Sequence, residues 1–492
     1  MGEPAVLAAL RIEALALGGP VVVTGVGRAR SSRVAGRKAA ALPAGAPAAV
    51  AGVAGGLGAE VLPGDLVVAT ELRTTDGTPA RPLPAAALVA AELRRGGLRV
   101  HEGPVVSVES VARGQRRAEL ATSGALAVDM ESAFVADALG ARPLVVVRAV
   151  ADTARRGPVR GGLRALGALR RVRPVLDRWG VAVGPREVVL AAPRSFCAGV
   201  ERAIDIVERA IERFGPPVYV RRQIVHNLHV VRELEGKGAV FVEELDEVPD
   251  GATVVLAAHG VSPEVRRQAE SRPGLSVIDA TCPLVAKVHQ EAKRYAARGY
   301  RIALVGHGDH EEVVGTLGEA PEHIHLVERP EDVDRLTFGP DEPVAYLTQT
   351  TLATDETAEI VAALQRRYPH VVGPHADDIC YATQNRQDAV RALAPSCDLV
   401  LVVGSSNSSN TARLVEVARR AGCRAELVED GSEVRLEWLD GVRRVGLTAG
   451  ASAPDALVHQ VVDALRALGP VEVAEHRTTE EHVRFSLPVQ VR

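Results

Sequence analysis

The sequence predicts an α/β protein with two domains. Short runs rich in β-branched residues alternate with amphipathic stretches of helical periodicity, a pattern typical of parallel sheets with crossover helices. The 492 residues are enough to bury more than one core, and a content of 47% hydrophobic and 24% charged residues is that of a globular chain. All five cysteines follow residue 196, so the two parts of the chain differ in chemistry.

The first domain is expected to span residues 1–184. Its stretch VVVTGVGRARSSR (21–33) has a strand–turn–helix pattern that suits a phosphate cradle, although the pattern has low specificity. We expect the domain to close with one charged helix in ALGALRRVRPVLDRWG (165–180), before a short linker near Gly184. A charged helix is favoured over an RNA-binding patch, because the net charge of the chain is −4.

The second domain is expected to span residues 187–492. Its expected strands are EVVLAAP (187–193), PVYVRR (217–222), TVVLAAHG (253–260), LSVIDAT (275–281), YRIALVGHG (300–308), EPVAYLTQ (342–349), DLVLVVGSS (398–406) and RRVGLTAGAS (443–452). Its expected helices lie in residues 199–215, 284–299, 354–369, 383–395 and 410–422. Most strands run directly into polar clusters such as DATC, GHGDH and GSSNSSN. Because the carboxyl ends of strands form the ligand crevice in open α/β sheets, we expect several small α/β units that face one centre.

Three cysteines are the most informative residues of this domain. Cys197, Cys282 and Cys380 lie too far apart for a local metal loop, yet each occupies a compact polar segment. Three such thiols suit an iron–sulfur cluster or a zinc site, and a zinc hydrolase with three cysteine ligands and a water is one interpretation. Cys397 and Cys423 lack such surroundings and are expected to be plain free thiols.

Eight segments around these cysteines carry a family resemblance. They are PRSFCAGVERAID, IVHN, LAAHGVSP, IDATCPLVAKVH, LTQTTL, DDICYATQNRQ, VVGSSNSSN and TAGASAP, in this order. Together they resemble the 4-hydroxy-3-methylbut-2-enyl diphosphate reductases, which catalyse the last step of the methylerythritol phosphate route to isoprenoids. The resemblance implies a trefoil of three α/β units around a central [4Fe-4S] cluster held by Cys197, Cys282 and Cys380. It also implies conversion of the hydroxylated allylic diphosphate to isopentenyl and dimethylallyl diphosphates, with electrons from a donor such as ferredoxin or flavodoxin.

The resemblance further implies the roles of individual side chains. Glu312 would deliver protons, and Thr350 would relay them to the departing hydroxyl. The diphosphate would be bound by hydroxyl, amide and imidazole groups, which need no metal; these belong to His226, His259, His310, Ser408, Ser409, Asn410 and Ser452. Strand-end histidines are often structural, and serines and asparagines in GSSNSSN also suit a helix cap. The chain reads His310-Glu311-Glu312-Val313 where the family usually has His-Pro-Glu-Val, which places a second carboxylate beside Glu312.

The first domain carries a second resemblance. The segments GVAGGL (52–57), PGDLVVATEL (63–72), VDMESA (128–133) and VVVRAVADTA (145–154) resemble the purine nucleoside phosphorylase and nucleosidase superfamily, and most of all the hopanoid-associated phosphorylases. The resemblance implies that Met130 and Glu131 meet the ribose, that Asp152 protonates the purine, and that Glu13 lies near the ribose or phosphate.

Two alternatives for the domains remain open. In the first, the N-terminal domain is degenerate and has only a structural role. In the second, the chain is a nucleoside phosphorylase whose C-terminal half binds a diphosphate or a protein partner without catalysis.

Composition also bears on partners and compartment. We expect no membrane span, because no uninterrupted apolar run of about 18 residues occurs, and no nucleic-acid partner, because the net charge is −4. The N-terminus lacks the basic region of a signal peptide. Five cysteines in a long chain favour metal binding or catalysis in a reducing compartment, so a cytoplasmic location is expected.

Overall fold

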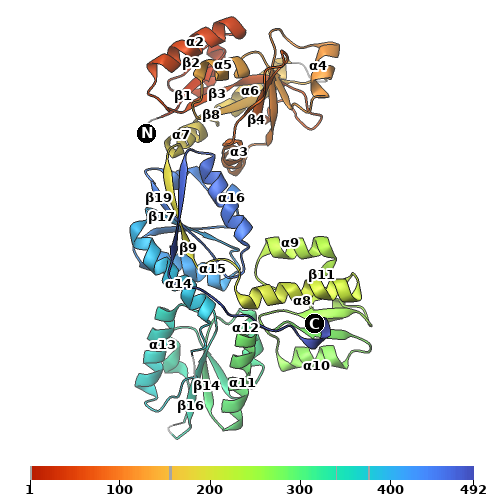
Figure 1. Cartoon of the computed structure of the whole chain (residues 1–492), viewed down its shortest axis with the longest axis vertical. Helices are drawn as coiled ribbons and strands as arrows, with labels where there is room; N and C mark the ends of the chain where they lie inside the picture. The colour runs from red at the N-terminus through yellow and green to blue at the C-terminus, as the bar shows by residue number, and fades with distance from the viewer. Residues whose placement is uncertain (1–2, 155–157, 340, 375–376) are drawn as a thin grey trace. The chain divides into compact units, whose positions relative to one another are not determined.

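The computed structural model of the chain describes residues 3–154, 158–339, 341–374 and 377–492 (Figure 1). Its contacts define two compact units. The first contains Met1–Glu187, Asp430–Arg443 and Gln460–Glu472, and the second contains Val188–Glu429, Arg444–His459 and Val473–Arg492. The predicted division into residues 1–184 and 187–492 stays a prediction, because each of these units draws on several stretches of the chain.

An eight-stranded sheet forms the centre of the first unit. The strand order is β2-β1-β3-β7-β6-β4-β5, and β8 pairs with both β3 and β4, so that β3, β7, β6, β4 and β8 close into a ring. The strands are β1 (Ala5–Ala8), β2 (Val22–Val23), β3 (Ala48–Gly56), β4 (Leu66–Thr74), β5 (Arg81–Pro82), β6 (Val100–Ser107), β7 (Ala127–Asp129) and β8 (Leu144–Asp152). The helices are α1 (Arg11–Leu17), α2 (Arg28–Ala41), α3 (Ala86–Arg95), α4 (Gly114–Ala121), α5 (Ser132–Leu139), α6 (Pro158–Leu169) and α7 (Arg173–Ala182).

The single charged helix predicted for residues 165–180 is wrong. The structure has two helices there, α6 and α7, with a break between Leu169 and Arg173. Pro174 lies in the first turn of α7, where its missing N–H leaves no hydrogen bond unmade. In the interior of a continuous helix the same proline would remove a hydrogen bond and clash with the carbonyl four residues earlier, so the chain restarts the helix instead.

Three separate sheets form the second unit, and the pairings within the first two are all parallel. They have the orders β11-β10-β12-β13, β15-β14-β16 and β18-β17-β19-β9-β20. The strands are β9 (Arg186–Ala192), β10 (Val218–Arg221), β11 (Ala239–Val242), β12 (Thr253–Leu256), β13 (Ser276–Asp279), β14 (Arg301–Val305), β15 (Ile324–Val327), β16 (Val344–Thr348), β17 (Leu399–Val403), β18 (Arg424–Val428), β19 (Arg444–Ala449) and β20 (Val471–Arg477). The predicted α/β class with three α/β units is therefore confirmed.

Helices cover these sheets and connect their strands. They are α8 (Ala198–Phe214), α9 (Leu228–Lys237), α10 (Pro263–Ser271), α11 (Pro283–Ala297), α12 (Glu311–Leu317), α13 (Thr354–Arg367), α14 (Tyr381–Leu393), α15 (Ser409–Arg420) and α16 (Asp455–Arg466). Short 3-10 turns complete the unit. In α8, Ala203, Ile206, Val207 and Ala210 recur on one face at helical spacing and are buried in the core of the β10 sheet, which fixes the helix there.

Each predicted strand of the second unit is present, but the pattern missed four others. These four, β11, β15, β18 and β20, all lie at the edge of a sheet. The helices α9, α10, α12 and α16 also go beyond the prediction.

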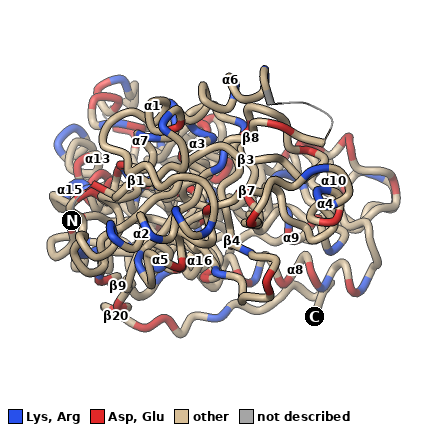
Figure 2. The backbone as a smooth tube through the Cα atoms, turned by 90° about the horizontal axis from the view of Figure 1, so that it is seen from above, with Lys and Arg blue, Asp and Glu red and all other residues tan. Residues whose placement is uncertain are grey.

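Charged residues are interspersed over the structure. Figure 2 shows Lys and Arg alternating with Asp and Glu along the backbone of many elements. Within the ranges that the structure describes, none of the helices has the length and apolar character that a membrane crossing needs.

Candidate active site

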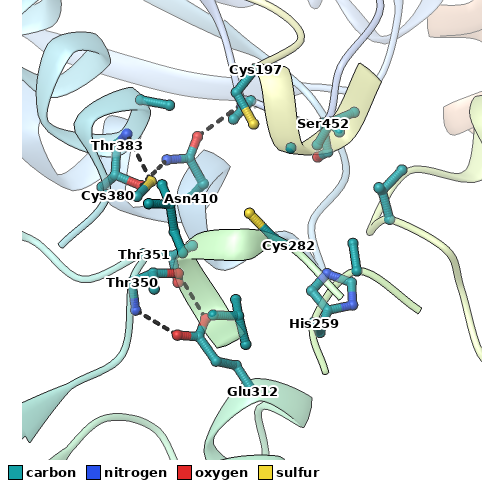
Figure 3. Close-up of a pocket in the computed structure, with 18 of the residues that line it drawn as sticks. Cys197, His259, Cys282, Glu312, Thr350, Thr351, Cys380, Thr383, Asn410 and Ser452 are labelled. Carbon is teal, nitrogen blue, oxygen red and sulfur yellow. Dashed lines mark hydrogen bonds between the residues drawn. The ribbon is translucent and has the colours of Figure 1, made fainter. Parts of the chain in front are cut away.

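A cavity of about 110 Å³ in the second unit gathers every site residue predicted there (Figure 3). Its lining includes the three cysteines Cys197, Cys282 and Cys380. It also includes His226, His259, His310, Glu312, Thr350, Ser408, Ser409, Asn410 and Ser452. Most of these residues lie between the end of a strand and the start of the next helix, and these strands belong to all three sheets, so strand ends build much of the cavity.

Each of the three cysteines is the N-cap residue of a helix. Cys197 precedes α8, Cys282 precedes α11 and Cys380 precedes α14. The positive end of a helix dipole favours a thiolate at this position. The Cys380 Sγ accepts a hydrogen bond from the Thr383 backbone N–H at 3.3 Å and lies 3.1 Å from the Thr383 Oγ1.

Burial opposes ionisation of two of these thiols. It raises the pKa of Cys282 to about 12 and the pKa of Cys380 to about 11, and the neighbouring cysteine sulfurs add to both increases. Without a metal bound to their sulfurs, both groups would therefore be protonated at neutral pH. A metal centre would have to displace these protons and would then satisfy the buried sulfurs as ligands.

A glycine keeps the space between two of the sulfurs open. A Cβ atom added at Gly199 would lie 2.8 Å from the Cys282 Sγ and 3.7 Å from the Cys197 Sγ. The first distance is too short for a normal contact, so any side chain here would intrude on the sulfurs. Among the residues that the structure describes, no group of three or more His, Cys, Asp or Glu side chains is arranged to hold one metal ion.

Glu312 is a buried carboxyl group joined to Thr350. Its side chain accepts hydrogen bonds from the Thr350 backbone N–H and the Thr350 hydroxyl, both at 2.8 Å, as Figure 3 shows. Burial raises the pKa of Glu312 to about 7, although the hydrogen bonds from Thr350 oppose this increase. The group can therefore hold a proton near neutral pH and release it readily, as a general acid must.

Three histidines line another side of the cavity. The rings of His226 and His259 stack with centroids 3.9 Å apart, and the His310 ring stands edge-on at 5.5 and 5.8 Å from them. Burial lowers the pKa of His226 and of His310 to about 4 and lowers that of His259 well below its ordinary value. Within the described part of the chain, the Nδ1 atoms of His226 and His259 are buried without a hydrogen-bond partner. The rings are thus neutral and have hydrogen-bonding capacity that a ligand can use.

The serine and asparagine side chains connect the strand ends. Ser408 caps α15, as the GSSNSSN pattern allows, and its hydroxyl accepts from the Thr411 N–H at 3.4 Å. The Ser452 hydroxyl donates to the His226 carbonyl oxygen at 3.1 Å. Asn410 accepts from the Ala451 N–H at 2.9 Å, so its side chain is already partly committed to the fold.

Some residues that line the cavity were not singled out by the sequence analysis. Thr351 and Thr383 lie within the segments LTQTTL and DDICYATQNRQ but were given no role, and Thr383 stands at the third helical position after Cys380, where a capping partner is expected. Phe485 also lines the cavity. No local pattern marks it, because it arrives from a segment far along the chain. Cys397 and Cys423 lie outside the cavity lining and are free thiols.

A second pocket, of about 500 Å³, lies in the first unit. Glu13, Met130, Glu131 and Asp152 all line it. The Glu13 carboxylate accepts from the Leu10 and Val53 backbone N–H groups at 2.7 and 2.8 Å.

Two arginines that the sequence patterns did not single out organise this pocket. Arg148 is fully buried, with its Nη2 atom 2.7 Å from Asp129 and 3.8 Å from Glu131. Arg117 pairs with Asp152 at 3.0 Å. Burial raises the pKa of Glu131 to about 7 although Arg148 opposes this increase.

The fold and the cavity define a three-unit α/β protein whose strand ends meet around three thiols. Residues 188–466 match the family model described as LytB protein, and the chain belongs to that family. The 4-hydroxy-3-methylbut-2-enyl diphosphate reductase of Cutibacterium acnes is 57% identical over 308 residues, which cover 62% of this chain and 95% of that protein. The enzyme of the same name from Acidothermus cellulolyticus is 58% identical over 308 residues, covering 62% of this chain and 90% of that protein.

A solved structure and a second family model complete the comparison. The structure of the E-1-hydroxy-2-methyl-but-2-enyl-4-diphosphate reductase from Plasmodium falciparum has a TM-score of 0.60 and 39% identity, covering 63% of this chain and 97% of that one. Residues 11–161 match the model described as phosphorylase superfamily.

Inorganic diphosphate is expected to bind this cavity with uptake of protons. The three imidazoles are neutral in the free cavity, and a bound anion raises their pKa values, so the complex holds more protons than its components. Affinity should therefore fall as pH rises from about 6 to about 8, by up to about tenfold for each proton taken up per pH unit.

Calorimetry in buffers of different ionisation enthalpy measures this proton uptake. His226→Asn should reduce it, whereas His482→Asn, at an exposed position outside the cavity, should not. Equal uptake by all three proteins would contradict the prediction.

Proposed function

We propose that residues 187–492 form an iron–sulfur enzyme that reduces (E)-4-hydroxy-3-methylbut-2-enyl diphosphate to isopentenyl diphosphate and dimethylallyl diphosphate. The observation that carries the proposal is one cavity that joins three thiols, three imidazoles and a carboxyl group of raised pKa. The 57% identity to the Cutibacterium acnes reductase, over 95% of that protein, supports the same activity. The decisive assay is anaerobic conversion of this substrate by the full chain with a reduced donor.

The proposed cofactor is a [4Fe-4S] cluster held by Cys197, Cys282 and Cys380. Three thiols at helix N-termini form a donor set that suits it, and Gly199 leaves the space beside two of the sulfurs free. When bound, such a cluster supplies electrons one at a time and, with three protein ligands, keeps one iron open.

The proposed role of the imidazole, hydroxyl and amide groups is to bind the diphosphate. His226, His259 and His310 can each donate an N–H to a phosphate oxygen, and a nearby anion favours their charged form. Ser408 and Ser452 offer hydroxyl groups from two neighbouring strand ends. This arrangement would fix the allylic end of the substrate against the thiol side of the cavity.

Glu312 and Thr350 are proposed to move protons. Replacing the hydroxyl by hydrogen consumes two electrons and two protons, and the oxygen leaves as water. Glu312 holds a proton near neutral pH and is hydrogen-bonded to the Thr350 hydroxyl, which can pass the proton to the departing oxygen. Burial of both side chains keeps bulk water from competing for that transfer.

The reaction needs an external source of electrons. We propose a one-electron donor such as ferredoxin or flavodoxin, because the two electrons must arrive singly. A cytoplasmic location suits the five free thiols, since a reducing compartment keeps them from oxidation.

Glu312→Gln is expected to lower turnover by about 10²- to 10⁴-fold while the protein folds and retains its cluster. The amide can still accept from the Thr350 N–H but cannot deliver a proton. In the wild type, kcat/KM should decrease as pH rises above about 7, because the carboxyl group loses its proton. Steady-state kinetics across pH checks both points. Turnover at the wild-type level would remove Glu312 from the role of acid.

Gly199→Ala tests the space needed by the cluster. Alanine favours the helix, by about 0.5–1 kcal/mol, so the protein should fold. The added Cβ would press against the Cys282 Sγ, and the iron content after anaerobic reconstitution should fall by more than about half.

Gly236→Ala is the matched control, since it lies in helix α9 with open space around the new Cβ. Iron, sulfide and zinc analysis with electron paramagnetic resonance of the reduced protein gives the readout. A colourless wild-type protein that contains zinc would contradict the proposal of an iron–sulfur cluster.

For the first unit we propose binding and cleavage of a purine nucleoside. The observation that favours it is the gathering of Glu13, Met130, Glu131 and Asp152 in one pocket of a chain segment that matches the phosphorylase superfamily model. Glu131, with a pKa of about 7, would contact the ribose, and Asp152 would face the departing base.

Full-length protein should release purine base from a nucleoside, and Asp152→Asn should reduce the release by about 10²-fold or more, because it removes the proposed acid. Chromatography of the free base measures this. Glu119→Gln on the exposed face of α4 is the control, and reductase activity should be unchanged in both variants. If the wild-type protein released no base from any purine nucleoside, the proposed activity of the first unit would be contradicted.

A further inference from the structure

We propose that residues 478–492, which follow β20, act as a clasp: through Arg386 and Arg202 they fix the positions of the three cysteine segments relative to one another. The inference rests on the proposed cluster. In Figure 1 this darkest blue segment runs from the sheet of β9 towards α8. It starts where the Thr478 N–H donates to the Ala192 carbonyl at 3.0 Å. Leu487 and Val491 then pack in the core beside α8. The clasp thus joins two of the three α/β units.

Arg386 connects the helix of one cysteine to the segment of another. It lies in α14, which Cys380 caps, and its side chain is fully buried. Its Nε and Nη2 atoms donate to the Ser195 carbonyl at 3.1 and 2.7 Å, and Nη2 also donates to the Phe196 carbonyl at 3.2 Å. Because Ser195 and Phe196 directly precede Cys197, this one guanidinium sets the distance between two cluster ligands.

Glu481 of the clasp supplies the charge that Arg386 needs. Its carboxylate accepts from the Arg386 Nη1 at 3.0 Å and from the Asn385 Nδ2 at 3.0 Å. The other acceptors of Arg386 are the neutral carbonyls of Ser195, Phe196 and Ala382. A buried cation without a counter-charge is strongly unfavourable, so Arg386 depends on Glu481 for its position.

Arg202 makes the second connection. It lies in α8, which Cys197 caps, and its Nη1 donates to the Ala280 and Thr281 carbonyls, both at 3.1 Å. These two residues directly precede Cys282. The Arg202 Nε donates to the Ser486 carbonyl of the clasp at 2.9 Å. One end of the clasp therefore supports the Cys197–Cys380 link, and the other supports the Cys197–Cys282 link.

Phe485 lies between these two supports and forms part of the cavity wall. The clasp thus closes the cavity while it fixes the helices whose N-termini carry the thiols. Arg386, Arg202 and Glu481 are accordingly positioning residues. They act on the spacing of the sulfurs, and through it on retention and electronic structure of the cluster.

Glu481→Gln tests the clasp, with Glu480→Gln as matched control. Glu480 is the neighbouring, more exposed acid, and it pairs with Arg477. In anaerobically reconstituted full-length protein, Glu481→Gln should speed the loss of iron to a chelator by about tenfold. The electron paramagnetic resonance spectrum of the reduced cluster should also change. Glu481→Asp, which keeps the charge, should restore most of the retention, and Glu480→Gln should match the wild type.

Thermal unfolding and hydrogen exchange of the metal-free proteins separate the possible outcomes. In the metal-free Glu481→Gln protein, exchange should accelerate in residues 195–199 and 378–384, which requires no cluster. A lower melting temperature with unchanged iron loss, spectrum and exchange in these segments would overturn the clasp. If the wild type took up no cluster, the proposed cofactor would fail, whereas the exchange measurement would still support or overturn the clasp.

Discussion

The structure of the second unit depends on bringing three helix N-termini, each capped by a cysteine, to one cavity. Burial disfavours the charged form of two of these thiols, and it raises the pKa of Cys282 to about 12 and that of Cys380 to about 11. The helix dipoles and the Thr383 N–H offset part of this penalty. Ionisation of Cys282 and Cys380 would therefore have to be coupled to the binding of a metal centre, which displaces their protons.

The arrangement of the strands also explains why polar side chains from distant parts of the chain gather at this cavity. In parallel sheets every strand ends at the same edge, so residues that follow β10, β12, β14, β16, β17 and β19 converge although they are far apart in the chain. The strands themselves can be almost wholly apolar, as β17 is, because the polar side chains of the site belong to the residues that follow the strands. Acid, imidazoles and thiols then line one small cavity.

Much of this arrangement can be predicted from the sequence, and the failures have physical causes. Central strands such as β12 and β17 are almost wholly buried apolar runs and were predicted, whereas edge strands such as β11 and β15 carry partly exposed residues in their middle. Helix α12 has only seven residues, too few to show periodicity, and Pro174 divides what reads as one helix into α6 and α7. The site residues that the sequence motifs singled out line the cavity of the second unit and the pocket of the first unit. Arg386 and Arg202 were not singled out, because they bind backbone carbonyls, whose position no side-chain pattern reports.

The pair Glu311–Glu312 shows how the fold separates two adjacent carboxyl groups. Glu311, which stands where the family usually has proline, points to Arg222 at 3.4 Å, and its other oxygen lies 3.8 Å from the His259 Nδ1. Glu312 lines the cavity, and within the described part of the chain its carboxyl group accepts hydrogen bonds only from the N–H and the hydroxyl of Thr350. Burial raises the pKa of both groups, but Arg222 opposes the increase for Glu311, while no cation does so for Glu312. The charge of the extra carboxylate is thus compensated by Arg222, and Glu312 keeps the raised pKa that its proposed role as the proton donor requires.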